Sequence, residues 1–338
     1  MAGLGFDCGT YNLVCCRRDE NKDFSHKREV NAFIEMPLEN RFVFNMMKNA
    51  GVPLIERTEA GIAYALGEAA VDIAYTMNDI ELKRPMKDGC LNPKEKYAQQ
   101  IMSIMMHSLL DELDEDKQQL YYSVPANAIN QDTDADYHSK VLEAVFNAFE
   151  DETGKVVEAH PINEALALVY AELKKTAYTG IGISFGAGMV NLCFAIYGAP
   201  IFEFALVNSG DWIDKMAARA TGESPTYINK EKMKVDLNED SDLLVQRAIK
   251  AQYEIMIQKT VTGIKNGIEE AGKSARADHP IDIVIAGGTS SPPGFDTMFS
   301  DVLKSSNIGI DIGEVIRPSD PLYSVARGCL VAAEAAQG

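Results

Sequence analysis

The chain has 338 residues, 46% of them hydrophobic and 24% charged, which is the composition of an ordinary globular protein. This length is large for one core, so we expect two lobes that each bury an interior. The formal net charge of −18 argues against nucleic acids and anionic membrane surfaces as main partners, because both carry negative charge themselves.

Cysteine usage and hydropathy point to a cytoplasmic protein. The six cysteines have no spacing typical of a metal site, so we expect reduced and mostly buried thiols. No segment approaches the roughly 18 apolar residues that a membrane span needs, and no signal peptide opens the sequence. The first predicted strand begins after about three residues, so we expect neither an N-terminal membrane helix nor direct membrane insertion.

The first predicted elements are two strands joined by a tight turn, over residues 4–18. An apolar run ends at Asp7, and a short turn then leads into another apolar run. The turn consists of Gly9, Thr10, Tyr11 and Asn12. Because Gly9 has no Cβ, backbone N–H groups here could come close to a phosphate, and Asp7 could hold a water of its Mg²⁺ ion. The alternative, that Gly9 only makes a turn, stays open at this point.

The next 150 residues alternate between strand-like and helix-like patterns. Residues 31–74 hold short apolar pieces and a helix, and a clearer alternation follows them. It predicts a helix over Lys94–Leu113, a strand over Leu120–Val124, a helix over Tyr137–Phe149, a strand over Lys155–Ala159 and a helix over Pro161–Lys175. Such alternation predicts a mixed, largely parallel sheet.

The pattern of the first hairpin then occurs again. Residues 181–194 form an apolar run, a glycine turn and an apolar run, with Ser184 in the place of Asp7. This second turn consists of Gly186, Ala187, Gly188 and Met189. A third glycine turn follows the apolar run 281–286 and contains Gly287, Gly288 and Thr289. Two similar hairpins roughly 175 residues apart indicate an internally duplicated α/β protein, with a nucleotide in the cleft between its halves.

The rest of the second half predicts two more strands and several helices. The strands are Val190–Tyr197 and Ile201–Val207, a helical stretch with Trp212 follows Gly210–Asp211, and Leu243–Ala271 reads as one long helix. The segment between Met233 and Leu243 is too short and polar for a sheet, so we expect this region to be mainly helical.

In this order, the motifs resemble those of the actin, sugar kinase and heat-shock chaperone ATPase superfamily, and above all its bacterial and archaeal actins of the MreB and MamK type. The first hairpin resembles the phosphate-1 loop, residues 181–191 the phosphate-2 loop, and Ala286–Gly294 the adenosine motif. Connecting segments are similar as well. They are Arg84–Gly89, Lys230–Met233, which resembles the ribose-contacting helix, and Asp320–Gly328, which resembles the closing helix.

The resemblance, which runs from residue 4 to 332, implies a duplicated actin-like (ribonuclease H-like) α/β fold with two lobes around a cleft for ATP or ADP and Mg²⁺. It implies that Asp7 and Ser184 hold the metal through water. The residues that it implies for nucleotide binding are Gly9, Thr10, Tyr11, Asn12, Gly186, Ala187, Gly188, Met189, Gly210, Asp211, Lys230, Glu231, Gly287, Gly288 and Thr289.

The resemblance also divides the chain into four parts. Residues 1–30, 75–178 and 318–338 would form the core of lobe I, with 31–74 as a small inserted subdomain. Residues 179–211 and 256–317 would form the core of lobe II. Residues 212–255 would be a reduced helical subdomain, although relatives usually carry strands there, and this departure puts the geometry of any filament in doubt.

The catalytic positions depart from the family as well. Ser184 stands where relatives have an aspartate, and Met189 where a threonine is common. His160, before Pro161, takes the place of the activating glutamate. A neutral imidazole could act as a base, but it could equally cap a helix. Glu164 could supply the missing carboxylate, so His160, Asp7 and Glu164 are the catalytic candidates, and we expect slow or tuned hydrolysis.

The function that the resemblance implies is a cytoskeletal filament that assembles with copies of itself and with an unidentified cargo or adaptor. A small-molecule kinase of the same fold is an alternative, although no acidic motif is placed for it. A chaperone-type ATPase would need a substrate-binding domain, and the sequence ends just after the closing helix. A nucleotide switch that does not polymerise is a variant of the first possibility.

Overall fold

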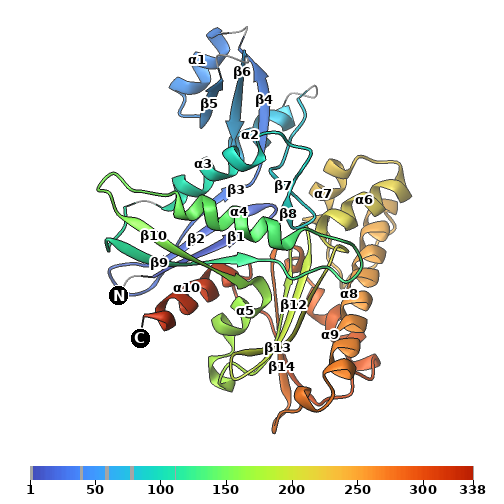
Figure 1. Cartoon of the computed structure of the whole chain (residues 1–338). Coiled ribbons are helices and arrows are strands. Elements are labelled where there is room, and N and C mark those ends of the chain that lie inside the picture. The colour runs from blue at the N-terminus through green and yellow to red at the C-terminus, as the bar shows by residue number, and fades with distance from the viewer. Residues whose placement is uncertain (1–2, 39–40, 58–60, 77–79, 111, 338) are drawn as a thin grey trace.

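The computed structural model describes residues 3–38, 41–57, 61–76, 80–110 and 112–337, whose strands gather into two larger sheets (Figure 1). The first sheet has the order β10-β9-β1-β2-β3. Its strands are β1 (Leu4–Cys8), β2 (Asn12–Arg18), β3 (Phe24–Val30), β9 (Lys117–Val124) and β10 (Val156–Asn163). The first three form an antiparallel meander, and β9 and β10 continue the sheet in parallel from β1.

The second sheet repeats this topology with the order β13-β12-β11-β14-β15. Its strands are β11 (Gly180–Phe185), β12 (Val190–Ile196), β13 (Ala199–Leu206), β14 (Ile281–Ala286) and β15 (Ile312–Ile316). Again a meander of three antiparallel strands is extended by two parallel strands. The matching strand orders show that the chain is built from two related halves, which confirms the expected duplicated α/β fold.

Two helices lie between the sheets (Figure 1). α10 (Ser324–Ala336) packs on β1 and β9, α5 (Glu164–Glu172) packs on β11 and β12, and the two helices pack on each other. Their axes approach closely because Gly328 lies against the backbone of Ala167, where a Cβ would collide with the carbonyl oxygen. A core of apolar residues from α5, α10 and β14 therefore joins the lobes at their base.

Other helices cover the outer faces of the sheets. α3 (Ala98–Leu110) and α4 (Ala135–Asn147) pack on the first sheet, and α8 (Leu244–Ala271) and α9 (Phe295–Ser305) pack around the second. Each sheet thus has its own apolar core, as a chain of this length requires. The six cysteines are all buried in these interiors, as expected.

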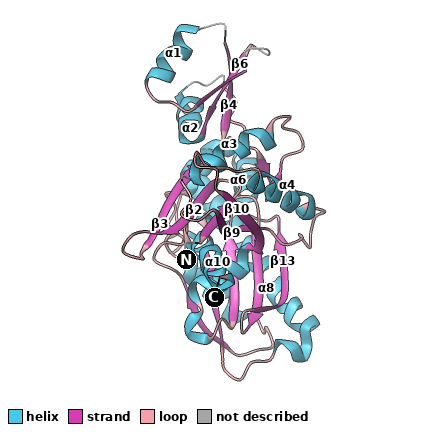
Figure 2. Ribbon diagram, turned by 60° about the vertical axis from the view of Figure 1, so that its left-hand side comes forward, coloured by secondary structure: helices cyan, strands magenta, loops and turns pink. Residues whose placement is uncertain are grey.

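A small part of the chain projects from lobe I (Figures 1 and 2). It contains a sheet of order β4-β6-β5 with two helices. Its elements are β4 (Phe33–Pro37), α1 (Arg41–Asn49), β5 (Leu54–Arg57), β6 (Ile62–Leu66) and α2 (Gly67–Thr76). The short hairpin of β7 (Met86–Lys87) and β8 (Cys90–Leu91) follows it at the cleft. The four-part division stays a proposal, and its end residues 1 and 338 lie outside the described residues.

Residues 207–280, all of which the structure describes, contain no strand. They form α6 (Gly210–Thr221), α7 (Pro225–Lys232), α8 and a short 3₁₀ turn. This agrees with the mainly helical region that the sequence predicts. Among the helices in the described residues, none combines the length and apolar character needed to cross a bilayer.

The bounds of several predicted elements differ from those in the structure, most of all in two helices. The helix expected over Pro161–Lys175 begins only at Glu164, because β10 continues through Pro161 and ends at Asn163. Pro161 is tolerated since β10 is an edge strand of its sheet, and the side chain of Asn163 caps the helix by accepting from the N–H groups of Ala165 and Leu166. The helix expected over Lys94–Leu113 is shorter, at Ala98–Leu110.

Candidate functional site

The turn of the first hairpin is held open toward a cleft between the lobes. Asn31, which follows β3, donates from Nδ2 to the carbonyl oxygen of Gly9 (3.0 Å) and from its backbone N–H to that of Tyr11 (2.8 Å). In a trans peptide the N–H points opposite to the C=O, so the N–H of Thr10 points away from Asn31. Thr10 lines the cleft, and this N–H is therefore available to an anion there.

The second hairpin turn is anchored in the same way from lobe II. The carbonyl oxygen of Gly186 accepts from the N–H of Gly210 (3.1 Å) and from Oγ1 of Thr289 (2.8 Å). The carbonyl oxygen of Ala187 accepts from the N–H of Asp211 (2.8 Å). Because these carbonyls point into lobe II, the N–H groups of Ala187 and Gly188 point the other way, and both residues line the cleft.

The two turns meet across the cleft. A Cβ at Gly188 would collide with the side chain of Thr10 and with the backbone of Gly89 in the β7–β8 hairpin. Only glycine allows the second turn to come this close to the first. Two sets of inward-pointing N–H groups, one from each lobe, therefore converge on one space, which suits a polyphosphate.

The third glycine turn borders the same cleft. Gly287 has φ +91°, and a Cβ there would lie 2.5 Å from the carbonyl oxygen of Phe185. Gly288 begins a 3₁₀ turn, and a Cβ added to it would have no neighbour within 4 Å. Gly287 is thus required by the fold, whereas Gly288 keeps space open in the cleft.

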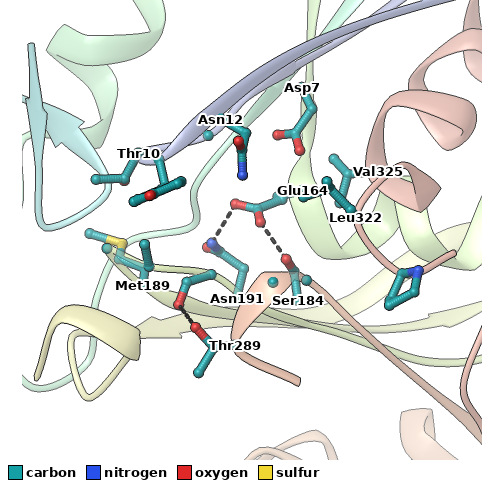
Figure 3. A pocket seen from close by; sticks show the side chains of 18 of the residues that line it. Asp7, Thr10, Asn12, Glu164, Ser184, Met189, Asn191, Thr289, Leu322 and Val325 are labelled. Carbon is teal, nitrogen blue, oxygen red and sulfur yellow. Dashed lines mark hydrogen bonds between the residues drawn. The ribbon is translucent and has the colours of Figure 1, made fainter. Parts of the chain in front are cut away.

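Two partly buried carboxyl groups face this space from lobe I (Figure 3). Asp7 accepts a hydrogen bond from Oγ of Ser123 (2.9 Å). Glu164, the first residue of α5, accepts from Oγ of Ser184 and from Nδ2 of Asn191 (2.7 Å). Burial raises the pKa of both groups, and the charge of Asp7 raises that of Glu164 further.

Glu164 lies beside Ser184, the position at which the resemblance predicts an aspartate. The carboxylate that relatives would have at this position is absent, but Glu164 reaches across from lobe I and is bonded to Ser184 itself. His160 is not among the residues that line the cleft. It lies within β10, where its ring stands beside Tyr121 at 5.1 Å between centroids. The later start of α5 is the reason, because it places Glu164 and not His160 at the cleft.

The residues of this segment that line the cleft are neighbours of the two that the sequence predicts to contact the ribose. Asn229 and Lys232 of α7, and Met233 directly after it, line the cleft at spacing i, i+3 and i+4. Lys230 and Glu231 do not line it, and Glu231 pairs with Lys234 instead (2.7 Å).

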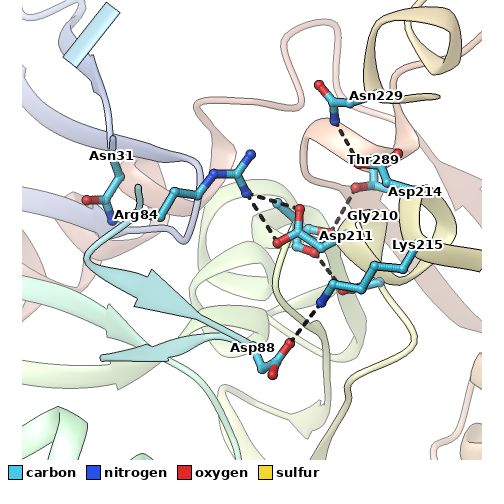
Figure 4. Close-up of polar contacts among 12 residues, drawn as sticks. Asn31, Arg84, Asp88, Gly210, Asp211, Asp214, Lys215, Asn229 and Thr289 are labelled. Carbon is cyan, nitrogen blue, oxygen red and sulfur yellow. Dashed lines mark hydrogen bonds and ion pairs between the residues drawn. The ribbon is translucent and has the colours of Figure 1, made fainter. Parts of the chain in front are cut away.

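Gly210 and Asp211 do not line the cleft either, but they support it. Both hold the second hairpin turn through their N–H groups, as described above. The carboxylate of Asp211 also pairs with Arg84 of lobe I (3.1 Å), whose guanidinium stands over the ring of Tyr11 at 4.7 Å. Figure 4 shows this contact beside a second pair across the lobes, between Lys215 and Asp88 (3.8 Å). The lobes are thus tied together next to both turns.

The cleft fits a nucleotide with Mg²⁺. Among the residues that the structure describes, no group of three or more His, Cys, Asp or Glu side chains is placed to hold a metal ion. A nucleotide-bound Mg²⁺ does not need such a cage, since one or two carboxylates, phosphate oxygens and water usually hold it. Asp7 and Glu164 are partly buried carboxyl groups, and a divalent ion beside them would favour their ionised forms.

Several residues of this site were not predicted from the sequence. Asn191 is a polar residue inside an otherwise apolar strand, and this is the only local signal it gives. Ser123 gives no such signal, because its strand β9 also contains Lys117, Gln118 and Gln119. Asn191 also accepts from the N–H of Ala126 (3.0 Å). This residue of lobe II therefore bonds to two residues of lobe I, Ala126 and Glu164. Tyr253, on α8, lines the cleft although the sequence places it inside a long helix without distinguishing features.

Comparisons with known proteins agree with the fold. A double helical filament of MamK has a similar structure, with a TM-score of 0.73, 17% sequence identity and 98% of each chain covered. A non-polymerising A278D mutant of MamK bound to AMPPNP has a TM-score of 0.59 and 16% identity, again over 98% of each chain. The ethanolamine utilization protein EutJ from Carboxydothermus hydrogenoformans has a TM-score of 0.55 and 16% identity, over 98% of this chain and 90% of that one.

These likenesses show the two-lobed actin-like fold that the motifs imply. No curated protein matches the chain by sequence. The family model described as Volactin matches residues 1–333, and the chain therefore belongs to the Volactin family.

Proposed function

We propose that this protein binds ATP with Mg²⁺ in the cleft between its lobes and assembles with copies of itself into filaments in a nucleotide-dependent way. The observation that carries the proposal is the convergence of two anchored glycine turns, one from each lobe, on a space that also contains Asp7 and Glu164. Among structures with this fold are a filament and a complex with a nucleotide analogue, which supports both parts of the proposal.

The turns would bind the phosphates through backbone N–H groups. Thr10 contributes from lobe I, and Ala187 and Gly188 contribute from lobe II. The protein has a net charge of −18, which repels an anion at long range. Backbone N–H groups can still bind the phosphates, because their dipoles attract an anion at short range within the cleft. Mg²⁺, when bound, would neutralise phosphate charge, with Asp7 and Glu164 as the carboxylates that hold its water ligands.

Hydrolysis would depend on Glu164. Its carboxylate would orient a water molecule and accept the water's proton as the oxygen bonds to the γ-phosphorus. The bond from that phosphorus to the bridging oxygen breaks, and ADP and phosphate are the products. Ser184 brings no charge of its own, so we expect a slow reaction.

Assembly would be linked to closure of the cleft. A nucleotide that contacts both turns favours the closed arrangement, and any subunit contact that also favours that arrangement is strengthened by binding. The ion pairs Arg84–Asp211 and Lys215–Asp88 belong to the closed arrangement, since they span the lobes. The buried thiols suit a reducing cytoplasm, where a cargo or adaptor would bind the filament.

Pelleting and electron microscopy test this proposal. The protein, at tens of micromolar, is incubated with Mg²⁺ and ATP, ADP, a non-hydrolysable analogue or no nucleotide. We expect filaments with ATP and the analogue, and fewer with ADP. Calorimetric binding of ATP without assembly under any condition of salt and pH would instead indicate a non-polymerising nucleotide switch. Absence of both binding and assembly would reject the proposal altogether.

A further inference from the structure

Helix α1 of the projecting subdomain presents an apolar and basic face to solvent. Phe44 is buried in a small apolar cluster with Leu38, and it fixes which face of the helix points inward. Phe42 and Met46, at spacing i and i+4, share the opposite face and are 74% and 56% exposed. The exposed Lys48 follows them near the end of the helix. We call these three exposed residues, Phe42, Met46 and Lys48, the helix patch.

A second exposed apolar pair lies in lobe II, where α8 begins. Leu243 and Leu244 are 61% and 57% exposed. The segment that leads to them does bury apolar side chains, since Val235 and Leu237 belong to the core of lobe II. The pair is instead left in solvent, directly after the exposed carboxylate of Asp242. We call Asp242, Leu243 and Leu244 the leucine patch.

The two patches carry opposite charge. Helix α1 contains two basic and no acidic residues, whereas residues 236–244 contain four acidic and no basic residues. Arg41 and Asp240, at the margins of the two patches, remain largely exposed although each has an ion-pair partner. Copies of a protein with a net charge of −18 repel one another at long range. A stable contact between copies therefore needs local pairing of opposite charge, and these two patches can provide it.

The patches lie on different lobes and on different sides of the molecule. Figure 1 shows α1 at the upper left, on the projecting subdomain, and α8 along the right-hand side of lobe II. The high exposure of both patches shows that neither covers the other within one molecule. A contact between two different surfaces repeats from copy to copy and forms an open chain unless its rotation closes a ring. An open chain is the arrangement that a filament needs.

We propose that the helix patch of one subunit docks on the leucine patch of the next subunit in the filament. This inference rests on the proposed function, because it names the surfaces through which the copies assemble. The apolar side chains exclude water from the centre of the contact, and the opposite charges pair at its rim. Each subunit uses lobe I for one neighbour and lobe II for the other. The geometry of the chain therefore depends on how the lobes are placed, which a nucleotide bound to both turns would fix.

Site-directed cross-linking tests the contact. One preparation carries Met46→Cys and a second carries Leu244→Cys, with different affinity tags, and the mixture is assembled with Mg·ATP and treated with a short bismaleimide. The six native cysteines are buried and should not react. We expect heterodimers that carry both tags, which a contact within one molecule cannot give. A chain with both substitutions should give a ladder of longer products. Ile104→Cys, at an exposed position of α3, replaces Met46→Cys as the control and should give no heterodimer.

A charge exchange tests the same contact by rescue. Lys48→Glu should raise the concentration needed for assembly about 3- to 10-fold, because it replaces an attraction by a repulsion. Adding Asp242→Lys to the same chain should restore most of this loss. Lys140→Glu is the matched control, since it is the same change at an exposed lysine of α4, and it should have little effect. ATP affinity in calorimetry should be the same in all these variants.

The outcomes separate this inference from the proposed function. Wild-type filaments without heterodimers in the cross-linking mixture would overturn the inference and leave the proposed function standing. The same holds if Lys48→Glu assembles like the wild type, if Asp242→Lys gives no rescue, or if Lys140→Glu weakens assembly equally. Cross-linked products that stop at the dimer for the chain with both substitutions would also overturn it. A wild type that does not assemble with ATP overturns the proposed function itself.

Discussion

Replacing Glu164 with glutamine separates the charge of this residue from its packing. Glutamine has nearly the same shape, and both hydrogen bonds can be kept. Its amide oxygen can accept from Nδ2 of Asn191, and its amide nitrogen can donate to Oγ of Ser184, whose hydroxyl then rotates. We therefore expect Glu164→Gln to fold and to differ from the wild type in electrostatics alone.

The first consequence is in the pH dependence of stability without nucleotide. Burial and the charge of Asp7 raise the pKa of Glu164, so the folded protein holds this proton more tightly than the unfolded chain does. The resulting stabilisation is complete below the unfolded pKa of about 4.3 and is lost as the pH rises toward the folded pKa. Between pH 5 and pH 7 the loss is up to about 3 kcal/mol, since each pH unit corresponds to about 1.4 kcal/mol.

The second consequence is in turnover. An amide cannot accept the proton of the attacking water, so phosphate release should fall about 10²- to 10⁴-fold. Binding of Mg·ATP should weaken less, because the backbone N–H groups of both turns remain. The assays are melting temperature against pH without nucleotide, single-turnover phosphate release, and calorimetric binding.

Controls come from the neighbouring strand β10. Glu158→Gln is the same chemical change at a residue that pairs with Lys117 outside the cleft (2.9 Å), and His160→Ala removes the base first considered from the sequence. Neither should slow phosphate release. If Glu164→Gln turns over like the wild type and melts with the same pH slope, the assignment of Glu164 as the catalytic carboxylate is wrong.

Three further outcomes are expected. Gly288→Val should melt like the wild type but lose ATP binding in calorimetry, because a side chain at this residue has free space and would occupy the cleft. Gly287→Val should instead unfold the protein, because a Cβ there collides with Phe185. Intact ATP binding by Gly288→Val would contradict this reasoning. Arg84→Ala breaks the pair with Asp211 and should speed nucleotide release several-fold in stopped-flow chase experiments. The release rate should also depend less on salt concentration than in the wild type. An unchanged release rate would mean that this pair does not hold the lobes together. Burial lowers the pKa of His138 to about 4, so the stability that its neutral form allows is complete above the unfolded pKa of about 6.5 and is lost as the pH falls toward 4. His138→Leu should therefore stabilise the protein by about 1–3 kcal/mol more at pH 5 than at pH 7, seen as a larger rise of the melting temperature at pH 5, and a gain that is equal at all pH values would argue against a buried neutral imidazole.

The duplicated fold could be predicted from the sequence because its signals are local. In each half, an apolar run, a glycine turn and a second apolar run follow directly on one another, and the structure forms both hairpins at those residues. Gly188 is required because a Cβ would collide with Thr10 and Gly89, and Gly287 is required by its positive φ. The glycines themselves therefore reveal where these turns lie.

The carboxylate proposed for catalysis was harder to assign because its place depends on where a helix begins. Pro161 favours the first turn of a helix, and this preference suggested that α5 begins there. Pairing of β10 with β9 and capping by Asn163 instead delay the helix to Glu164. A shift of three residues therefore replaces His160 with Glu164 at the cleft, although both were candidates.

The end of the cleft formed by α7 and α8 could not be predicted, because it depends on packing between distant segments. Lys232 is buried against Asp214 on another helix, and Tyr253 reaches the cleft from the middle of α8. Neither residue carries a local signal that distinguishes it from an ordinary helical lysine or tyrosine.

A structure of the protein with Mg²⁺ and a non-hydrolysable ATP analogue tests the central claim most directly. We expect the triphosphate between Gly9–Asn12 and Gly186–Met189, in contact with both turns, with the metal on the side of Asp7 and Glu164. A nucleotide bound elsewhere, or in contact with only one lobe, would contradict the account.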